Sequence, residues 1–212
     1  TYSWTGPDLF TSSIQNPSIT AVATTNGGIY NVTVDAAGCI GTASTTLVIN
    51  PMVAPNITQV GPYCSSDNDE QLVASLPGGT WSGTGIVNPA SGQFAPTVAG
   101  AGSHAITYTV NAPCALPATT TIVVNPLPVV NLSAPILSGC EPFTATFTDQ
   151  SLPASNSVVW DFGDGNTSSQ TGSVSHTFNA VGCYDITLTS TSTAGCVNTT
   201  TLPNYICVNP YA

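Results

Sequence analysis

One sequence pattern recurs three times and constrains the fold more than any other feature: a β-branched run that ends in Asn-Pro. It occurs at 48–51, 123–126 and 208–210. β-Branched residues favour strands, and a stiff X-Pro step after a strand is typical of the joint between tandem β-domains. The three prolines stand 75 and 84 residues apart, which is the size of a small β-sandwich. The spacing predicts three domains, at 1–50, 51–125 and 126–212.

The first predicted domain is short. It is roughly 25 to 34 residues smaller than the others, or about two strands with their turns. Tyr30, Val32 and Val34 alternate with polar residues, as in a half-buried strand. An open sandwich exposes unpaired ladder groups and an apolar core. We therefore expect either a fragment of a longer array or a neighbouring subunit that donates strands, which would link chains head to tail into a filament.

Charge excludes several partners. The chain has no Lys or Arg, ten Asp and Glu, and a formal net charge of −10. Nucleic acids and anionic lipids are bound chiefly through Lys and Arg, so neither is an expected partner. No apolar run approaches the roughly 18 residues of a membrane span, and we expect no membrane insertion.

Seven cysteines in a β-rich chain indicate an oxidising, extracellular or cell-surface setting. The absence of a Cys-x-x-Cys spacing favours disulfides over a zinc site. In the second domain, Cys64 and Cys114 stand near the first and next-to-last strands, which predicts a bridge between them. Cys39 is left over, and its partner is expected in the missing part of the first domain. Three pairings are open in the third domain, among Cys140, Cys183, Cys196 and Cys207.

The third domain also carries a distinctive series of motifs, at 147–151, 160–165 (Trp-Asp-Phe-Gly-Asp-Gly), 175–178 and 182–188. Over about residues 130–209 this series resembles a polycystic kidney disease (PKD) domain, an Ig-like sandwich of two antiparallel sheets. The first two domains resemble the Ig-like and PKD-like repeats of very large bacterial surface adhesins, at 2–7 and 78–85. The resemblance implies an all-β chain of tandem Ig-like/PKD-like antiparallel β-sandwiches, the first one incomplete. It also implies the pairs Cys140–Cys196 and Cys183–Cys207, because related domains carry Gly-Cys at both positions of the first pair.

The carboxylates offer two candidate sites. Asp67, Asp69 and Glu70 share one loop and form a possible calcium ligand set, although they lack the spacing of a twelve-residue calcium loop. A solvated turn is the commoner explanation of such a cluster. Asp149, Asp161 and Asp164 suggest paired-carboxylate glycoside hydrolysis, but their positions in the PKD motif indicate turn-forming hydrogen bonds instead.

No residue is predicted to be catalytic and no cofactor is expected. His104 is expected to pack beside Ile106 and Tyr108, and His176 to be structural. Sequons make glycosylation possible at five asparagines, of which two are predicted to be exposed. The five are Asn31, Asn56, Asn131, Asn166 and Asn198.

These features favour a non-enzymatic structural protein of the cell exterior. It would be a subunit of a surface fibre or a segment of a long repetitive adhesin, with copies of itself, neighbouring repeats, glycans or surface receptors as partners. The alternative is a carbohydrate- or protein-binding accessory region of a secreted hydrolase. That alternative predicts an exposed aromatic platform, for which Trp4 and Trp81 are the candidates.

Overall fold

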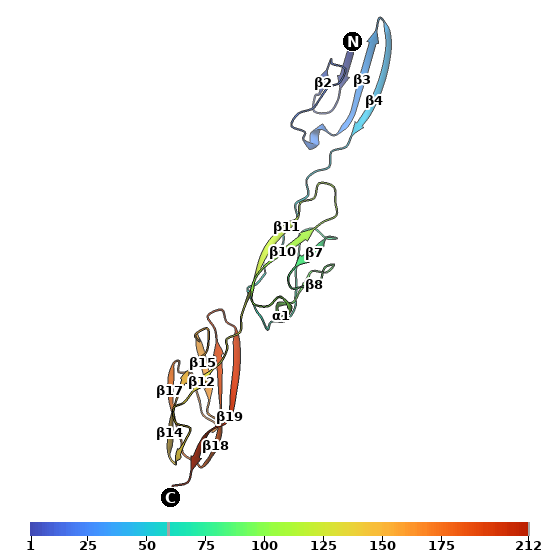
Figure 1. The fold of residues 1–212 in the computed structure, drawn as a ribbon. Coiled ribbons are helices and arrows are strands. Elements are labelled where there is room, and N and C mark those ends of the chain that lie inside the picture. Colours follow the sequence, from blue (N-terminus) through green and yellow to red (C-terminus); the bar gives the residue numbers. More distant parts are fainter. Residues whose placement is uncertain (59, 212) are drawn as a thin grey trace.

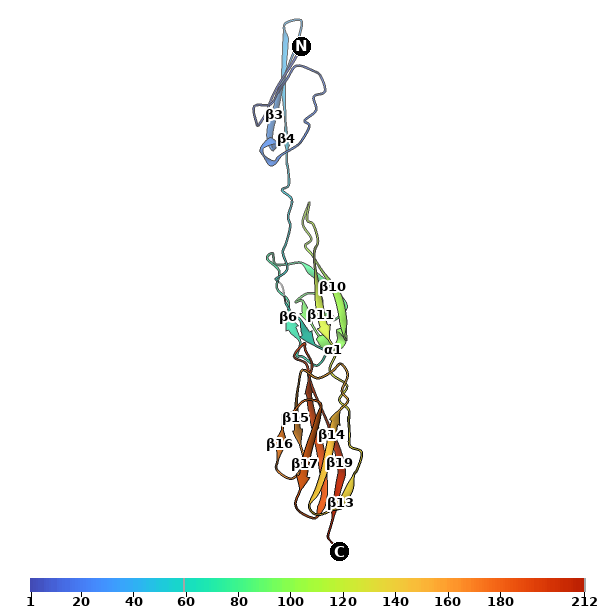
Figure 2. The same cartoon turned by 90° about the vertical axis from the view of Figure 1, so that its left-hand side faces the viewer.

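The computed structural model describes residues 1–58 and 60–211 and is almost entirely β (Figure 1). Its strands fall into three groups that share no sheet, here called units one, two and three. In both views the units follow one another in a row (Figure 2). Among the described residues, no helix is long and apolar enough to cross a membrane.

Unit one is a single antiparallel sheet with the strand order β2-β1-β3-β4. Its longest pair, β3 and β4, is joined by a tight turn at Ala37 and Gly38, both with positive φ. Tyr30 is buried and Val32 and Val34 are half-buried, which confirms the predicted face of this strand. The elements are β1 (Tyr2–Thr5), β2 (Thr11–Ser12), the 3-10 turn η1 (Thr24–Asn26), β3 (Gly28–Ala36) and β4 (Cys39–Leu47).

Unit two has a four-stranded sheet, β5-β11-β10-β7, and a three-stranded sheet, β6-β9-β8. Their apolar faces enclose a core that includes Trp81, Phe94, Ile106, Tyr108 and Ile122. The elements are β5 (Tyr63–Cys64), β6 (Glu70–Gln71), β7 (Thr80–Gly83), β8 (Ile86–Asn88), β9 (Gln93–Phe94), the one-turn helix α1 (Pro96–Ala99), β10 (Gly102–Thr109) and β11 (Ala118–Asn125).

Unit three is a two-sheet sandwich, with β12-β14-β17 packed against β13-β19-β18-β15-β16. Trp160 and Phe162 are almost fully buried, at 0% and 2% exposure, against Phe147 of the opposite sheet. The elements are β12 (Leu132–Ser133), β13 (Ser138–Cys140), β14 (Phe143–Asp149), β15 (Ser157–Asp161), β16 (Thr167–Ser168), β17 (Ser173–Phe178), β18 (Gly182–Thr191) and β19 (Val197–Asn209).

The next-to-last strand begins in the same way in all three units. Each starts with a glycine whose φ lies between 141° and 158°, a region that L side chains rarely adopt. The residue two positions after this glycine is a tyrosine or a histidine. Its side chain hydrogen-bonds to the backbone carbonyl of the residue four positions before it, at 2.7 to 2.9 Å. These glycine–ring pairs are Gly28 with Tyr30, Gly102 with His104, and Gly182 with Tyr184. The three units are therefore built on one plan, and half-buried His104 is a packing residue as expected.

Candidate functional site

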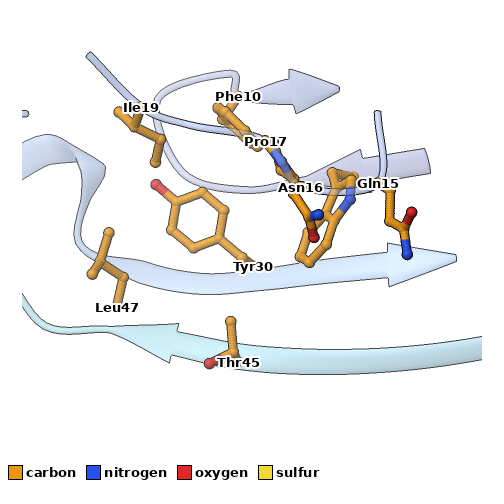
Figure 3. A pocket seen from close by; sticks show the side chains of 9 residues that line it. Phe10, Gln15, Asn16, Pro17, Ile19, Tyr30, Thr45 and Leu47 are labelled. Atoms are coloured by element: carbon orange, nitrogen blue, oxygen red, sulfur yellow. The ribbon is translucent and has the colours of Figure 1, made fainter. Parts of the chain in front are cut away.

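The sheet of unit one leaves an apolar groove on one face (Figure 3). Trp4 projects into it from β1 and Tyr30 from β3, and the groove has a volume of about 360 Å³. The ring of Phe10 packs edge-on against Tyr30 with centroids 5.3 Å apart. The other lining residues are Gln15, Asn16, Pro17, Ile19, Thr45 and Leu47.

Unit three shows what this face is in a complete sandwich. Trp4 pairs with Ser12 and Val32, and Trp160 pairs with Ser168 and Leu188 at the same sequence offsets. Each indole Nε1 donates to a carbonyl ten residues later, at 3.1 Å. Trp160 is fully buried, whereas Trp4 is half-buried. The groove face thus corresponds to the core face of β15 and β18.

The opposing sheet explains this difference in burial. In unit three, β17 pairs with β14 and covers the core. The matching stretch of unit one, residues 13–27, contains no strand and only the turn η1. Within residues 1–58 no strand equivalent to β14 is present, so this stretch has no ladder partner and lies over Tyr30 as a loop. The structure therefore agrees with an open first sheet.

The disulfides differ from the predicted set. The expected Cys183–Cys207 bond is present and joins opposite residues of β18 and β19. The other bond joins Cys64 to Cys196, 132 residues apart, and ties unit two to unit three. Cys39, Cys114 and Cys140 are exposed thiols.

The predicted bonds Cys64–Cys114 and Cys140–Cys196 are wrong because each pair spans the length of a strand. Cys64 lies opposite Asn125 at the end of β11, and Cys114 precedes the start of β11. Seven strand steps separate these ends by roughly 23 Å, whereas bridged Cα atoms lie within about 7 Å. Cys140 and Cys196 flank β19 in the same way.

The joint between units two and three is also held by polar contacts. The Asn198 Nδ2 donates to the Pro128 carbonyl at 2.9 Å, and Cys196 is 1% exposed beside the Asn125 carbonyl. Of the five sequon asparagines, the other four are exposed. Glycosylation of Asn198 would occupy the nitrogen that makes this contact, so the joint disfavours sugar there. Glycan attachment at Asn31, Asn56, Asn131 and Asn166 stays a prediction.

The predicted calcium set does not converge on one point. The Asp67 Oδ2 accepts from the Cys64 N–H at 2.7 Å, and the Asp69 Oδ2 accepts from the Gln93 side chain at 2.9 Å. Glu70 lies on β6, paired with Phe94. Among the described residues, no three His, Cys, Asp or Glu side chains are grouped to hold a metal. Asp67 fixes a local turn and Asp69 contacts Gln93 of β9, so the three carboxylates have separate surroundings, which corrects the calcium prediction.

The aspartates of the PKD motif form turns, as expected. Asp161 accepts from the Gly163 N–H and Asp164 from the Asn166 N–H, at 2.9 and 3.1 Å. The other Asp164 oxygen is 2.7 Å from the His176 Nε2, whose ring stacks on Phe162. Burial raises the pKa of Asp164, but the hydrogen bonds from His176 and Asn166 outweigh it, and the net pKa lies below the usual value.

The aromatic platform of the hydrolase alternative is not formed by Trp81. Trp81 is 4% exposed and packs on the Tyr108 ring with centroids 4.6 Å apart. Trp4 is half-buried in the groove of unit one. The two indoles belong to different units and do not form one surface.

Comparison with known proteins supports the description of unit three. Residues 123–207 match the PKD domain family. The PKD1 domain of Vibrio cholerae metalloprotease PrtV is 26% identical to this chain, covering 39% of this chain and 98% of that domain, with a TM-score of 0.33. The PKD1 domain of Vibrio anguillarum Epp is 28% identical, covering 39% of this chain and 96% of that domain, also with a TM-score of 0.33. The N-terminal eight Ig domains of Down Syndrome Cell Adhesion Molecule align with 98% of this chain and 32% of that one, at 13% identity and a TM-score of 0.42. No curated protein matches the sequence.

Proposed function

Starting from a PKD domain in unit three preceded by Ig-like units, we propose that this chain is a non-enzymatic structural segment of an extracellular fibre or long repetitive adhesin. PKD and Ig-like tandem domains suggest an extracellular adhesion or structural module. The three domains of the proposal are 1–50, 51–125 and 126–212. The observation that carries it is the Cys64–Cys196 bond, which joins consecutive units in addition to the peptide chain.

The exposed strand faces suit such a setting. Threonine and serine hydroxyls form cross-strand pairs at 2.8 to 3.1 Å on both sheets of unit three. Because the sequence has no Lys or Arg, trypsin-like proteases have no cleavage site. A covalent joint, paired surface hydroxyls and the lack of tryptic sites favour a connector that persists outside the cell.

Assembly is proposed to occur by strand donation at the groove of unit one. The groove face corresponds to a core face that unit three covers with β14 and β17. An added strand would bury Trp4 and Leu47 and pair with the unpaired loop over Tyr30. Because Trp4 is half-buried and Leu47 is only 37% exposed, completing their burial contributes roughly half or less of the 1.5 to 3 kcal/mol that full burial of such a side chain supplies.

Electron microscopy and light scattering of the whole chain over a concentration series test this assembly. We expect filaments in the wild type and their loss in Thr45→Glu, which places a carboxylate in the groove. Thr46→Glu is the matched control, because Thr46 is the next residue of β4 and does not line the groove. A stable monomer whose unit one is fully protected from hydrogen exchange would overturn strand donation, as would equal effects of the two variants.

A further inference from the structure

The seven cysteines occupy repeating positions. One type, here called the turn cysteine, lies just before or at the start of the last strand of each unit: Cys39, Cys114 and Cys196. They precede the asparagine of the Asn-Pro joint by 11, 11 and 13 residues. Cys39 and Cys196 both end an Ala-Gly-Cys sequence. The turn cysteine is thus a fixed element of the repeat.

A second type, here called the edge cysteine, lies on a short strand that runs parallel to the last strand of its unit. Cys64 of β5 is opposite Asn125, and Cys140 of β13 is opposite Asn209. In both cases the N–H of the next residue donates to that asparagine carbonyl, at 2.9 and 3.0 Å. The two edge cysteines are therefore equivalent and stand where one unit meets the next.

The bond between units two and three joins one cysteine of each type. Edge Cys64 of unit two reaches turn Cys196 of unit three, with Cα atoms 5.5 Å apart. This bond gives a rule: the edge cysteine of one unit bonds to the turn cysteine of the unit that follows. Among the described residues, edge Cys140 and turn Cys39 form no disulfide, and both are exposed thiols.

These two thiols lie at opposite ends of the row of units. The turn that carries Cys39 is at the end where the N-terminus lies (Figure 1), and β13 lies in the last unit, towards the C-terminus (Figure 2). We propose that Cys140 of one copy forms a disulfide with Cys39 of the next copy, joining copies head to tail. The proposal rests on the proposed function of a repeating subunit and names the contact that would link its copies.

The remaining turn cysteine, Cys114, lies beside Val53. Its carbonyl accepts from the Val53 N–H, and the Leu116 N–H donates to the Val53 carbonyl. Cys114 thus lies in the joint between units one and two, where the rule requires an edge cysteine from unit one. None of β1–β4 is a short strand parallel to the last strand of unit one, so this sheet supplies no edge cysteine. The rule therefore pairs Cys114 with a cysteine of the segment that completes unit one, and Cys39 with Cys140 of the preceding copy.

The bond forms by exchange with a low-molecular-weight or protein disulfide as oxidant. The Cys140 thiolate attacks that disulfide, giving a mixed disulfide and releasing one thiol. The Cys39 thiolate then attacks the mixed disulfide at the Cys140 sulfur. The S–S bond joins the copies, and the oxidant accepts two electrons and two protons as its second thiol leaves.

Peptide mapping of the whole oxidised chain tests the pairing. The chain is incubated with oxidised glutathione under assembly conditions, separated on a non-reducing gel, and digested with pepsin at acid pH for mass spectrometry. We expect a ladder of linked copies containing Cys39–Cys140 peptides. Cys39→Ser and Cys140→Ser should each abolish the ladder, and Cys114→Ser should retain it. A mixture of the first two variants should give dimers and no longer species.

The other outcomes decide against the bond or against the proposed function. Cys39–Cys39 or Cys140–Cys140 peptides would show random oxidation, and loss of the ladder in Cys114→Ser would show that the rule is wrong. Filaments in which Cys39 and Cys140 stay reduced would overturn this bond and leave the proposed function intact. Linked copies that never form filaments would support this bond and overturn the proposed function.

Discussion

The Cys64–Cys196 bond sets how far the chain can be stretched. A pulling force applied at the two termini reaches Cys64, crosses the disulfide and leaves from Cys196. Residues 65–195, which include most of units two and three, then carry no load. Cys64→Ser removes this bypass and places both units in the force path, except the 24-residue span that the Cys183–Cys207 bond still closes.

The magnitude follows from the chain length that the bond encloses. The bond closes a loop of 132 residues, and in the variant the Cys183–Cys207 bond still keeps 24 residues out of the force path. The net gain of 108 residues, at about 3.3 to 3.6 Å per extended residue, amounts to roughly 360 to 390 Å of added contour length. The chain-entropy model also assigns a loop of this size a stabilisation of about 5 kcal/mol relative to the open unfolded chain. Cys64→Ser should therefore lower the free energy of unfolding as well as lengthen the stretched chain.

Single-molecule force spectroscopy with handles at the two termini measures the added length directly. Without reductant we expect Cys64→Ser to extend roughly 360 to 390 Å further than the wild type. A reductant that opens both disulfides should add roughly 440 to 480 Å to the wild type. Cys140→Ser is the matched control, because Cys140 is an exposed thiol. The reasoning fails if the unreduced wild type extends to the full length, or if Cys64→Ser extends no further than the wild type.

Three further predictions concern the packing of the indoles, the acid stability of the fold and the glycine turn. Trp160→Ala should lower the free energy of unfolding by about 3 to 5 kcal/mol because Trp160 is fully buried, and Trp4→Ala by roughly half of that or less because Trp4 is half-exposed; calorimetry measures both. The lowered pKa of Asp164 means that its carboxylate stabilises the fold above about pH 4 and that this contribution is lost as the pH falls through the folded-state pKa. The acid-side decline of the melting temperature should therefore be shallower in Asp164→Asn than in the wild type. Gly163→Ala should lower the free energy of unfolding more than its control Gly165→Ala, which urea titration measures. Both glycines have positive φ, which costs an alanine about 1 to 2 kcal/mol. Only at Gly163 would the added Cβ also meet a backbone carbonyl oxygen, that of Asp185, at 2.5 Å.

The sequence was sufficient to predict unit three because its signals are local. Strand alternation places Trp160 and Phe162 on one face, and Asp161 and Asp164 accept hydrogen bonds from N–H groups only two residues further on. The repeated glycine and ring at the start of each next-to-last strand was overlooked, although the spacing from Gly102 to His104 is visible in the sequence.

The Cys64–Cys196 pair was beyond the sequence argument for a physical reason. The sequence pattern shows which strand each cysteine adjoins. It does not show which end of the unit holds that cysteine. A disulfide within one unit closes a shorter loop and is therefore the expected pairing. The length of β11 nevertheless keeps Cys64 and Cys114 apart. The available signal was the repeated distance from each turn cysteine to its Asn-Pro joint.

Unit one shows how far strand formation depends on a partner. Residues 13–27 take the place of β17, but they form a strand only where a neighbour like β14 supplies hydrogen-bond partners. The sheet β2-β1-β3-β4 nonetheless keeps the register of unit three, because its four strands pair with one another. The information for half a sandwich is therefore local to that half.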